Sequence, residues 1–169
     1  SIKNLLNIYL HLLTAFPFKT TFLTLFIAYL PYVIISYPAI FQGDTYSQIV
    51  QAYKQLGTSG IYYMTNDQLL SSNIFINQHH PVVHTLLIHI FLLIGSTLFH
   101  SLNVGIFFYA LFQWAACILT ISYGIKVLIK DAKISEKYAM LCVIYFIISP
   151  RIQNYMFLVT KDVLYSVFF

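Results

Sequence analysis

Long apolar stretches constrain this chain more than any other feature, because a membrane-spanning helix needs about 20 predominantly apolar residues. Three stretches reach that length, at about residues 21–41, 104–125 and 138–159. Hydrophobic residues make up 59% of the chain and charged residues only 8%, whereas a soluble domain carries about 25% charged residues. A soluble fold could not bury this much apolar surface. We therefore expect an all-α, polytopic membrane protein whose helical bundle is partly covered by lipid.

The lysines give the predicted spans a direction. Lys3 and Lys19 precede the first span, and four more lysines crowd the stretch at about 126–137: Lys126, Lys130, Lys133 and Lys137. Loops rich in Lys and Arg lie on the cytoplasmic side, so the N-terminus and this loop are both predicted to be cytoplasmic. The net charge of +4 is spread along the chain. No basic stripe with interleaved aromatic residues is present, so no nucleic-acid partner is expected.

A fourth apolar stretch, Pro81–Phe99, is predicted to differ from the three spans. If both this stretch and 104–125 crossed the bilayer, the lysine loop would lie outside the cell. The charge pattern therefore favours a helix at about 81–99 that lies along the external face or dips into it. Two full crossings remain the alternative. The chain also ends within an apolar run at Phe169, and we interpret it as the N-terminal part of a single transmembrane domain.

The region at about 42–103 then becomes an external loop with two juxtamembrane helices. The first is predicted at about 44–56, because apolar residues recur there at helical spacing and Gln48 and other polar residues fall between them. The apolar positions are Tyr46, Ile49, Val50, Tyr53 and Leu56. The second is the helix at about 81–99.

Polar residues that gather on the predicted external face form the candidate site. They are Asp44 after the first span, His79 and His80 before Pro81, Arg151 near the outer end of the third span, and Lys161 and Asp162 beyond it. Ionisable groups near a membrane are costly, so such a cluster favours a functional interpretation.

Each candidate also has a structural interpretation. Asp44 could cap the helix that follows it. His79 and His80 could form a turn before a helix that begins at Pro81, a position that favours proline. Lys161 and Asp162 could belong to a solvated helix end.

The order of these motifs resembles the N-terminal module of the GT-C glycosyltransferases, from about residue 32 to residue 169. This group includes protein O-mannosyltransferases, aminoarabinose transferases of lipid A and the catalytic subunits of oligosaccharyltransferases. The resemblance implies an essential acid in the first external loop, matched by Asp44, and a second acid matched by Asp162. His80-Pro81-Val82-Val83 resembles a His-Pro-Pro-Leu motif of the family but lacks its second proline.

The resemblance further implies a transferase that moves a sugar from a polyprenyl-phosphate donor to a protein, lipid or cell-wall acceptor on the external face, with inversion. Asp44 would act as general base. Lys161, Arg151 or a protonated His80 would offset the charge of the leaving phosphate. Asp162 with His79 would hold a divalent metal ion or orient the acceptor. The composition and the absence of a transit peptide suggest a bacterial plasma membrane.

Two other functions are compatible with the sequence. A transporter or flippase of a lipid-linked glycan predicts polar residues at mid-membrane depth and repeated halves; Gln113 and Thr120 are the clearest polar residues within the spans. A non-catalytic membrane scaffold would not need Asp44.

Overall fold

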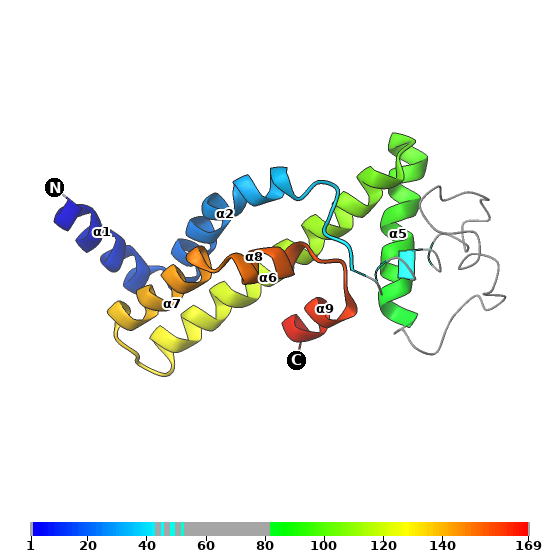
Figure 1. The fold of residues 1–169 in the computed structure, drawn as a ribbon. Helices are drawn as coiled ribbons and strands as arrows, with labels where there is room; N and C mark the ends of the chain where they lie inside the picture. Colours follow the sequence, from blue (N-terminus) through cyan, green and yellow to red (C-terminus); the bar gives the residue numbers. More distant parts are fainter. Residues whose placement is uncertain (1, 43–44, 46–47, 50–51, 53–81, 169) are drawn as a thin grey trace. The chain divides into compact units, whose positions relative to one another are not determined.

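The computed structural model describes residues 2–42, 45, 48–49, 52 and 82–168 (Figure 1). Over these residues the chain forms helices and no strand, apart from an isolated parallel bridge between Ile40 and Leu158. The helices are α1 (Ile2–Ala15), α2 (Pro17–Ile35), α5 (Val82–Phe99), α6 (Leu102–Lys130), α7 (Glu136–Ile148), α8 (Pro150–Phe157) and α9 (Lys161–Phe168). The prediction of an all-helical fold is confirmed for this part of the chain.

Three of these helices, α2, α5 and α6, are long and apolar enough to cross a membrane. The helix predicted at about 81–99 is thus present as α5, and its length and composition would allow it to cross. Its predicted position along the external face stays a prediction. The chain divides into two compact units, and each is described separately below.

Unit 1 consists of Ser1–Ile35 and Trp114–Met156. In it α1 packs against α2 and α7, and α2 packs against α7. A row of aromatic rings follows one face of α2: the Phe22 and Phe26 centroids are 6.0 Å apart, and Phe26 lies 5.4 Å from Trp114 of α6. Leu25 of α2, Ile118 of α6 and Val143 of α7 are fully buried, so all three helices contribute to the core of this unit.

Prolines set the ends of α2, which is shifted from the predicted span at 21–41. Pro17 is its first residue, where the missing N–H costs nothing. The helix ends at Ile35, shortly before Tyr37-Pro38, because a proline disfavours helical geometry in the residue before it. Pro31 lies within α2, and Pro38 lies beyond its end.

The predicted third span, 138–159, is divided into α7 and α8 at Ser149. Pro150 has no N–H, so the carbonyl oxygen of Phe146 loses its helical partner. The Tyr29 hydroxyl donates to this oxygen at 2.8 Å, and the Gln153 amide Nε2 donates to the carbonyl of Ile147. Side chains of unit 1 thus satisfy the backbone groups that the break leaves open, as a membrane interior requires.

Replacing the buried Tyr29 by Phe should destabilise the full-length protein by about 1–2 kcal/mol, because the partly buried Phe146 carbonyl would lose its donor. Thermal unfolding of purified Tyr29→Phe in detergent measures the effect. Tyr145→Phe is the matched control, since Tyr145 lies on α7 and its side chain is 59% exposed. Equal stability of the two variants would contradict the role given to Tyr29.

The second predicted span, 104–125, extends further at its C-terminus than expected. Lys126 and Lys130, predicted to lie in a loop, belong to the last turns of α6. The connection to α7 is therefore short and covers residues 131–135. Ser135 caps α7 by accepting a hydrogen bond from the Lys137 N–H at 3.4 Å, and Glu136 stands in the first turn, where negative charge is favourable.

Unit 2 consists of Ser36–Gln113 and Phe157–Phe169. Its helices α5 and α6 meet at two glycines near their connection. A Cβ added at Gly95 would lie 2.4 Å from the Gly105 Cα, and one added at Gly105 would lie 2.6 Å from the Phe91 carbonyl oxygen. His100 ends α5 with φ at 50°. The backbones of α5 and α6 approach so closely here that neither glycine could carry a Cβ without moving a helix.

The predicted helix at 44–56 is described at residues 45, 48, 49 and 52, all of which are helical and buried. These positions lie on one helical face. Ile49 was predicted to lie on the apolar face, but Gln48, predicted among the polar positions, is only 1% exposed. The carbonyl oxygen of Ala52 lies 2.8 Å from the His89 Nδ1 atom of α5, so residue 52 contacts α5.

Candidate functional site

A chain of buried hydrogen bonds crosses unit 2 and begins at His84 in the first turn of α5. The His84 Nε2 atom lies 2.6 Å from the Tyr109 hydroxyl, which donates to Gln113 Oε1 at 3.0 Å. Gln113 Nε2 in turn donates to the Leu158 carbonyl at 2.8 Å. Because the single Tyr109 hydrogen points to Gln113, His84 must donate to Tyr109 through a protonated Nε2.

A second set of bonds joins the segment after α2 to the segment before α9. Ile40 N donates to the Phe157 carbonyl at 3.0 Å, and Val159 N donates to the Ile40 carbonyl at 3.1 Å. The buried Thr45 hydroxyl donates to the Val159 carbonyl at 2.7 Å and accepts from Gln42 N at 3.2 Å. Segments more than 110 residues apart in sequence therefore pair directly.

These bonds bring together residues that are adjacent in sequence to several predicted site residues. Thr45 follows Asp44 directly, and Val159 and Thr160 precede Lys161. Asp44, His79 and His80 themselves lie outside the described residues. Their predicted roles therefore stay predictions.

The described candidates fall into both units. Lys161 is half-buried and Asp162 is exposed; both occupy the first turn of α9 in unit 2. Arg151 is exposed on α8 and belongs to unit 1. Lys161 and Asp162 thus directly follow one of the paired segments. That Arg151 belongs to the same site stays a prediction.

The metal prediction rests on Asp162 and His79. Within the described ranges, no three His, Cys, Asp or Glu side chains come together as a metal-binding group. Since His79 lies outside those ranges, the pair is untested. A carboxylate and an imidazole remain a chemically suitable pair for a divalent ion.

Two buried polar atoms near the paired segments have no hydrogen-bond partner among the residues that the structure describes. They are Thr160 Oγ1, one residue before Lys161, and Gln48 Nε2, three residues after Thr45. Thr160 and Gln48 are 8% and 1% exposed. Buried polar groups are normally paired, so these atoms mark positions where a further polar group would be favourable.

Sequence reasoning missed Thr45, His84 and Tyr109 as parts of a polar network. Each has an ordinary place in an apolar or interfacial helix, and their connection depends on contacts between distant segments. Gln113 carried the clearest signal, because an amide within an apolar span must find a partner. The bonds of Gln113 to Tyr109 and to the Leu158 carbonyl now account for its polarity.

Together these features define a membrane-embedded protein that is helical over the part the structure describes and whose unit 2 holds a buried polar network. The chain belongs to DUF6020, a family of unknown function, whose model matches residues 12–169. No curated protein and no solved structure matches the chain.

Proposed function

We propose that this chain is part of a membrane glycosyltransferase of the GT-C type, which moves a sugar from a polyprenyl-phosphate donor to an acceptor on the extracytoplasmic face. The proposal rests on the pairing of the segments at 40–45 and 157–160. One segment carries Asp44, and the other leads directly into Lys161 and Asp162. Asp44 would thus supply the base and Lys161 the cation of one site, although the two residues are distant in sequence.

In this mechanism the acceptor hydroxyl attacks the anomeric carbon of the donor sugar. Asp44 accepts the hydroxyl proton as the new C–O bond forms. The bond between the anomeric carbon and the phosphate oxygen breaks, and polyprenyl phosphate leaves with the electron pair. A direct displacement of this kind inverts the anomeric centre.

Lys161 is the proposed partner of the leaving phosphate. It stands at the N-terminus of α9, where the helix dipole favours an anion. Its ammonium group adds a full positive charge. Asp162 stands in the same turn with the opposite charge. We propose that Asp162, together with His79, orients the acceptor or holds a divalent metal ion. It has no role in binding the phosphate.

The internal bonds of Gln113 support an enzyme over a transporter. A transport path needs polar groups at mid-membrane depth that can contact the cargo. Gln113 is fully buried, and its amide bonds to Tyr109 and to the Leu158 carbonyl. Its polarity therefore serves to fix the segment that precedes Lys161.

The proposal is tested with the full-length protein in two stages. Mass spectrometry of envelope glycans from cells with and without the protein first identifies the transferred sugar. Release of polyprenyl phosphate by the purified protein then measures turnover. Identical glycans in the two cell types, together with no donor turnover, would exclude the proposed activity.

Lys161→Gln should reduce turnover by about 100-fold, because the charge developing on the leaving phosphate would lose its ammonium partner. Lys133→Gln is the control, since Lys133 lies in the short connection between α6 and α7. The two variants should have the same thermal stability. Full turnover by Lys161→Gln would remove this residue from the proposed mechanism.

A further inference from the structure

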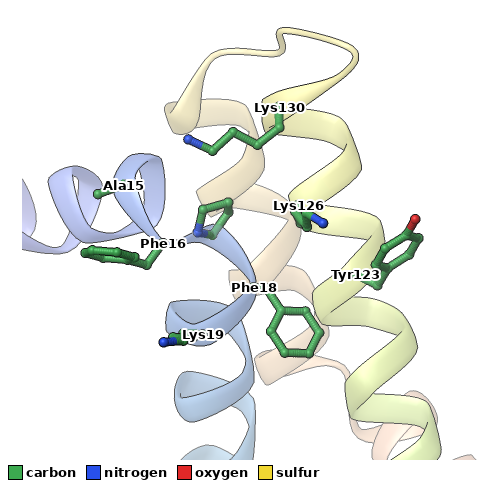
Figure 2. Close-up of a pocket in the computed structure, with 8 residues that line it drawn as sticks. Ala15, Phe16, Phe18, Lys19, Tyr123, Lys126 and Lys130 are labelled. Atoms are coloured by element: carbon green, nitrogen blue, oxygen red, sulfur yellow. The ribbon is translucent and has the colours of Figure 1, made fainter.

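A cavity of about 480 Å³ lies in unit 1 where α1 joins α2 beside the end of α6 (Figure 2). Its polar lining is basic: Lys19 comes from the first turn of α2, and Lys126 and Lys130 come from the last turns of α6. The rings of Phe16 and Tyr123 also line it, and their side chains are 58% and 57% exposed. We call this cavity the lysine pocket.

The lysines of the pocket keep most of their capacity to bind an anion. Lys130 reaches toward the joint between α1 and α2, where its Nζ donates to the Thr14 carbonyl at 2.8 Å (Figure 2). An ammonium group has three N–H donors, so this bond uses one of them. Lys126 Nζ lies 5.3 Å from the centroid of the Tyr123 ring. No carboxylate of the described residues forms an ion pair with Lys126 or Lys130.

The pocket lies at the level where a bilayer surface is expected. It opens at the first turn of α2 and at the last turns of α6, two of the three helices that are long and apolar enough to cross. The 19 residues of α2 extend over roughly 28 Å, which matches the hydrocarbon thickness of about 30 Å. Groups at the start of α2 therefore stand at the depth of lipid headgroups.

Apolar side chains continue from the pocket along the same helices. Leu119 of α6, one helical turn before Tyr123, is 45% exposed. Leu23 and Ile27 follow Lys19 at four-residue spacing on α2 and are 56% and 64% exposed. A lipid with its phosphate at Lys126 and Lys130 would lay an acyl chain along α6 at Leu119, and the face of α2 below Lys19 offers apolar surface at the edge of the site. A free phosphate ion would make no use of this apolar surface.

We propose that the lysine pocket binds the phosphate of an anionic phospholipid, with Lys126 and Lys130 as its main ligands and Lys19, which projects from the other side of α2, at its edge (Figure 2). Basic pockets between transmembrane helices are suited to anionic headgroups. The site lies in unit 1 and contains none of the proposed catalytic residues. It therefore does not depend on the proposed transferase activity.

Native mass spectrometry of the delipidated full-length protein, titrated with phosphatidylglycerol or phosphatidylcholine, tests the proposal. The wild type should retain phosphatidylglycerol in preference to phosphatidylcholine. The double variant Lys126→Gln/Lys130→Gln should bind phosphatidylglycerol at least tenfold more weakly, since each lysine near an anionic lipid contributes about fivefold in affinity. Lys126→Arg/Lys130→Arg should retain binding, which separates loss of charge from loss of folding.

The matched control is Lys133→Gln/Lys137→Gln, which removes the same charge from residues that follow α6 and do not line the pocket. It should bind the lipid as the wild type does. Equal weakening in the control, or equal retention of the two lipids by the wild type, would overturn the proposal. Displacement of phosphatidylglycerol by excess inorganic phosphate would show that the pocket is a site for free phosphate and not for a lipid.

Discussion

Asp44→Asn in the full-length protein is expected to lower sugar transfer by about 10²–10⁴-fold, the range that a general base contributes. An amide has the size of the carboxylate but cannot accept the proton of the acceptor hydroxyl. Donor binding should change little, because the donor phosphate is assigned to Lys161. The measurement is release of polyprenyl phosphate by the purified variant, with binding of the donor followed separately.

Asp67→Asn is the control for this experiment, because Asp67 lies in the same predicted external loop and has no role in the mechanism. It should retain the turnover of the wild type. Wild-type turnover by Asp44→Asn would exclude Asp44 as the base. Loss of donor binding in that variant would point to a structural role, such as the helix cap that the sequence also allows.

Gly95→Ala and Gly105→Ala are each expected to destabilise the protein by about 3 kcal/mol, at the upper end of the range for overpacking. The added methyl group at Gly95 would lie 2.4 Å from the Gly105 Cα, and that at Gly105 would lie 2.6 Å from the Phe91 carbonyl oxygen. Both contacts are with backbone, which cannot turn aside as a flexible side chain can. Helices α5 and α6 would have to separate, and Tyr109 would lose its alignment with His84.

Gly124→Ala provides a matched control on α6, because a Cβ at Gly124 would meet nothing within 4 Å. Alanine is the better helix former by about 1 kcal/mol, so this variant should be as stable as the wild type or more stable. Thermal unfolding of the three variants in the same detergent gives the comparison. Similar stability of Gly95→Ala and Gly124→Ala would show that the close approach of α5 and α6 does not hold in solution.

The apolar stretches at about 21–41, 81–99 and 104–125 correspond to α2, α5 and α6, because length and composition decide whether a segment can cross a bilayer. Helix α1 was not predicted. The ends of the helices were less predictable. Local chemistry decided two of them: Pro17 begins α2, and Pro150 divides the predicted third span. The end of α6 at Lys130 differs from the predicted loop because lysine favours helix and is also suited to the last turn.

The candidate site was predictable only in part, since its residues are distant in sequence. Isolated ionisable residues such as Lys161 and Asp162 are conspicuous in an apolar chain and could be selected from sequence alone. The bond of Thr45 to Val159, and the bridge of Ile40 to Leu158, cannot be inferred from any local pattern. Asp44, His79 and His80 lie outside the described residues, so their roles rest on sequence reasoning.

The bond of Gln113 to Leu158 also bears on how the protein assembles. Chains are made from the N-terminus, so Gln113 is synthesised before its acceptor at Leu158. Until Leu158 is in place, the hydrogen bond from Gln113 Nε2 cannot form. Unit 2 is therefore closed only when its later segment, Phe157–Phe169, joins its earlier segment, Ser36–Gln113.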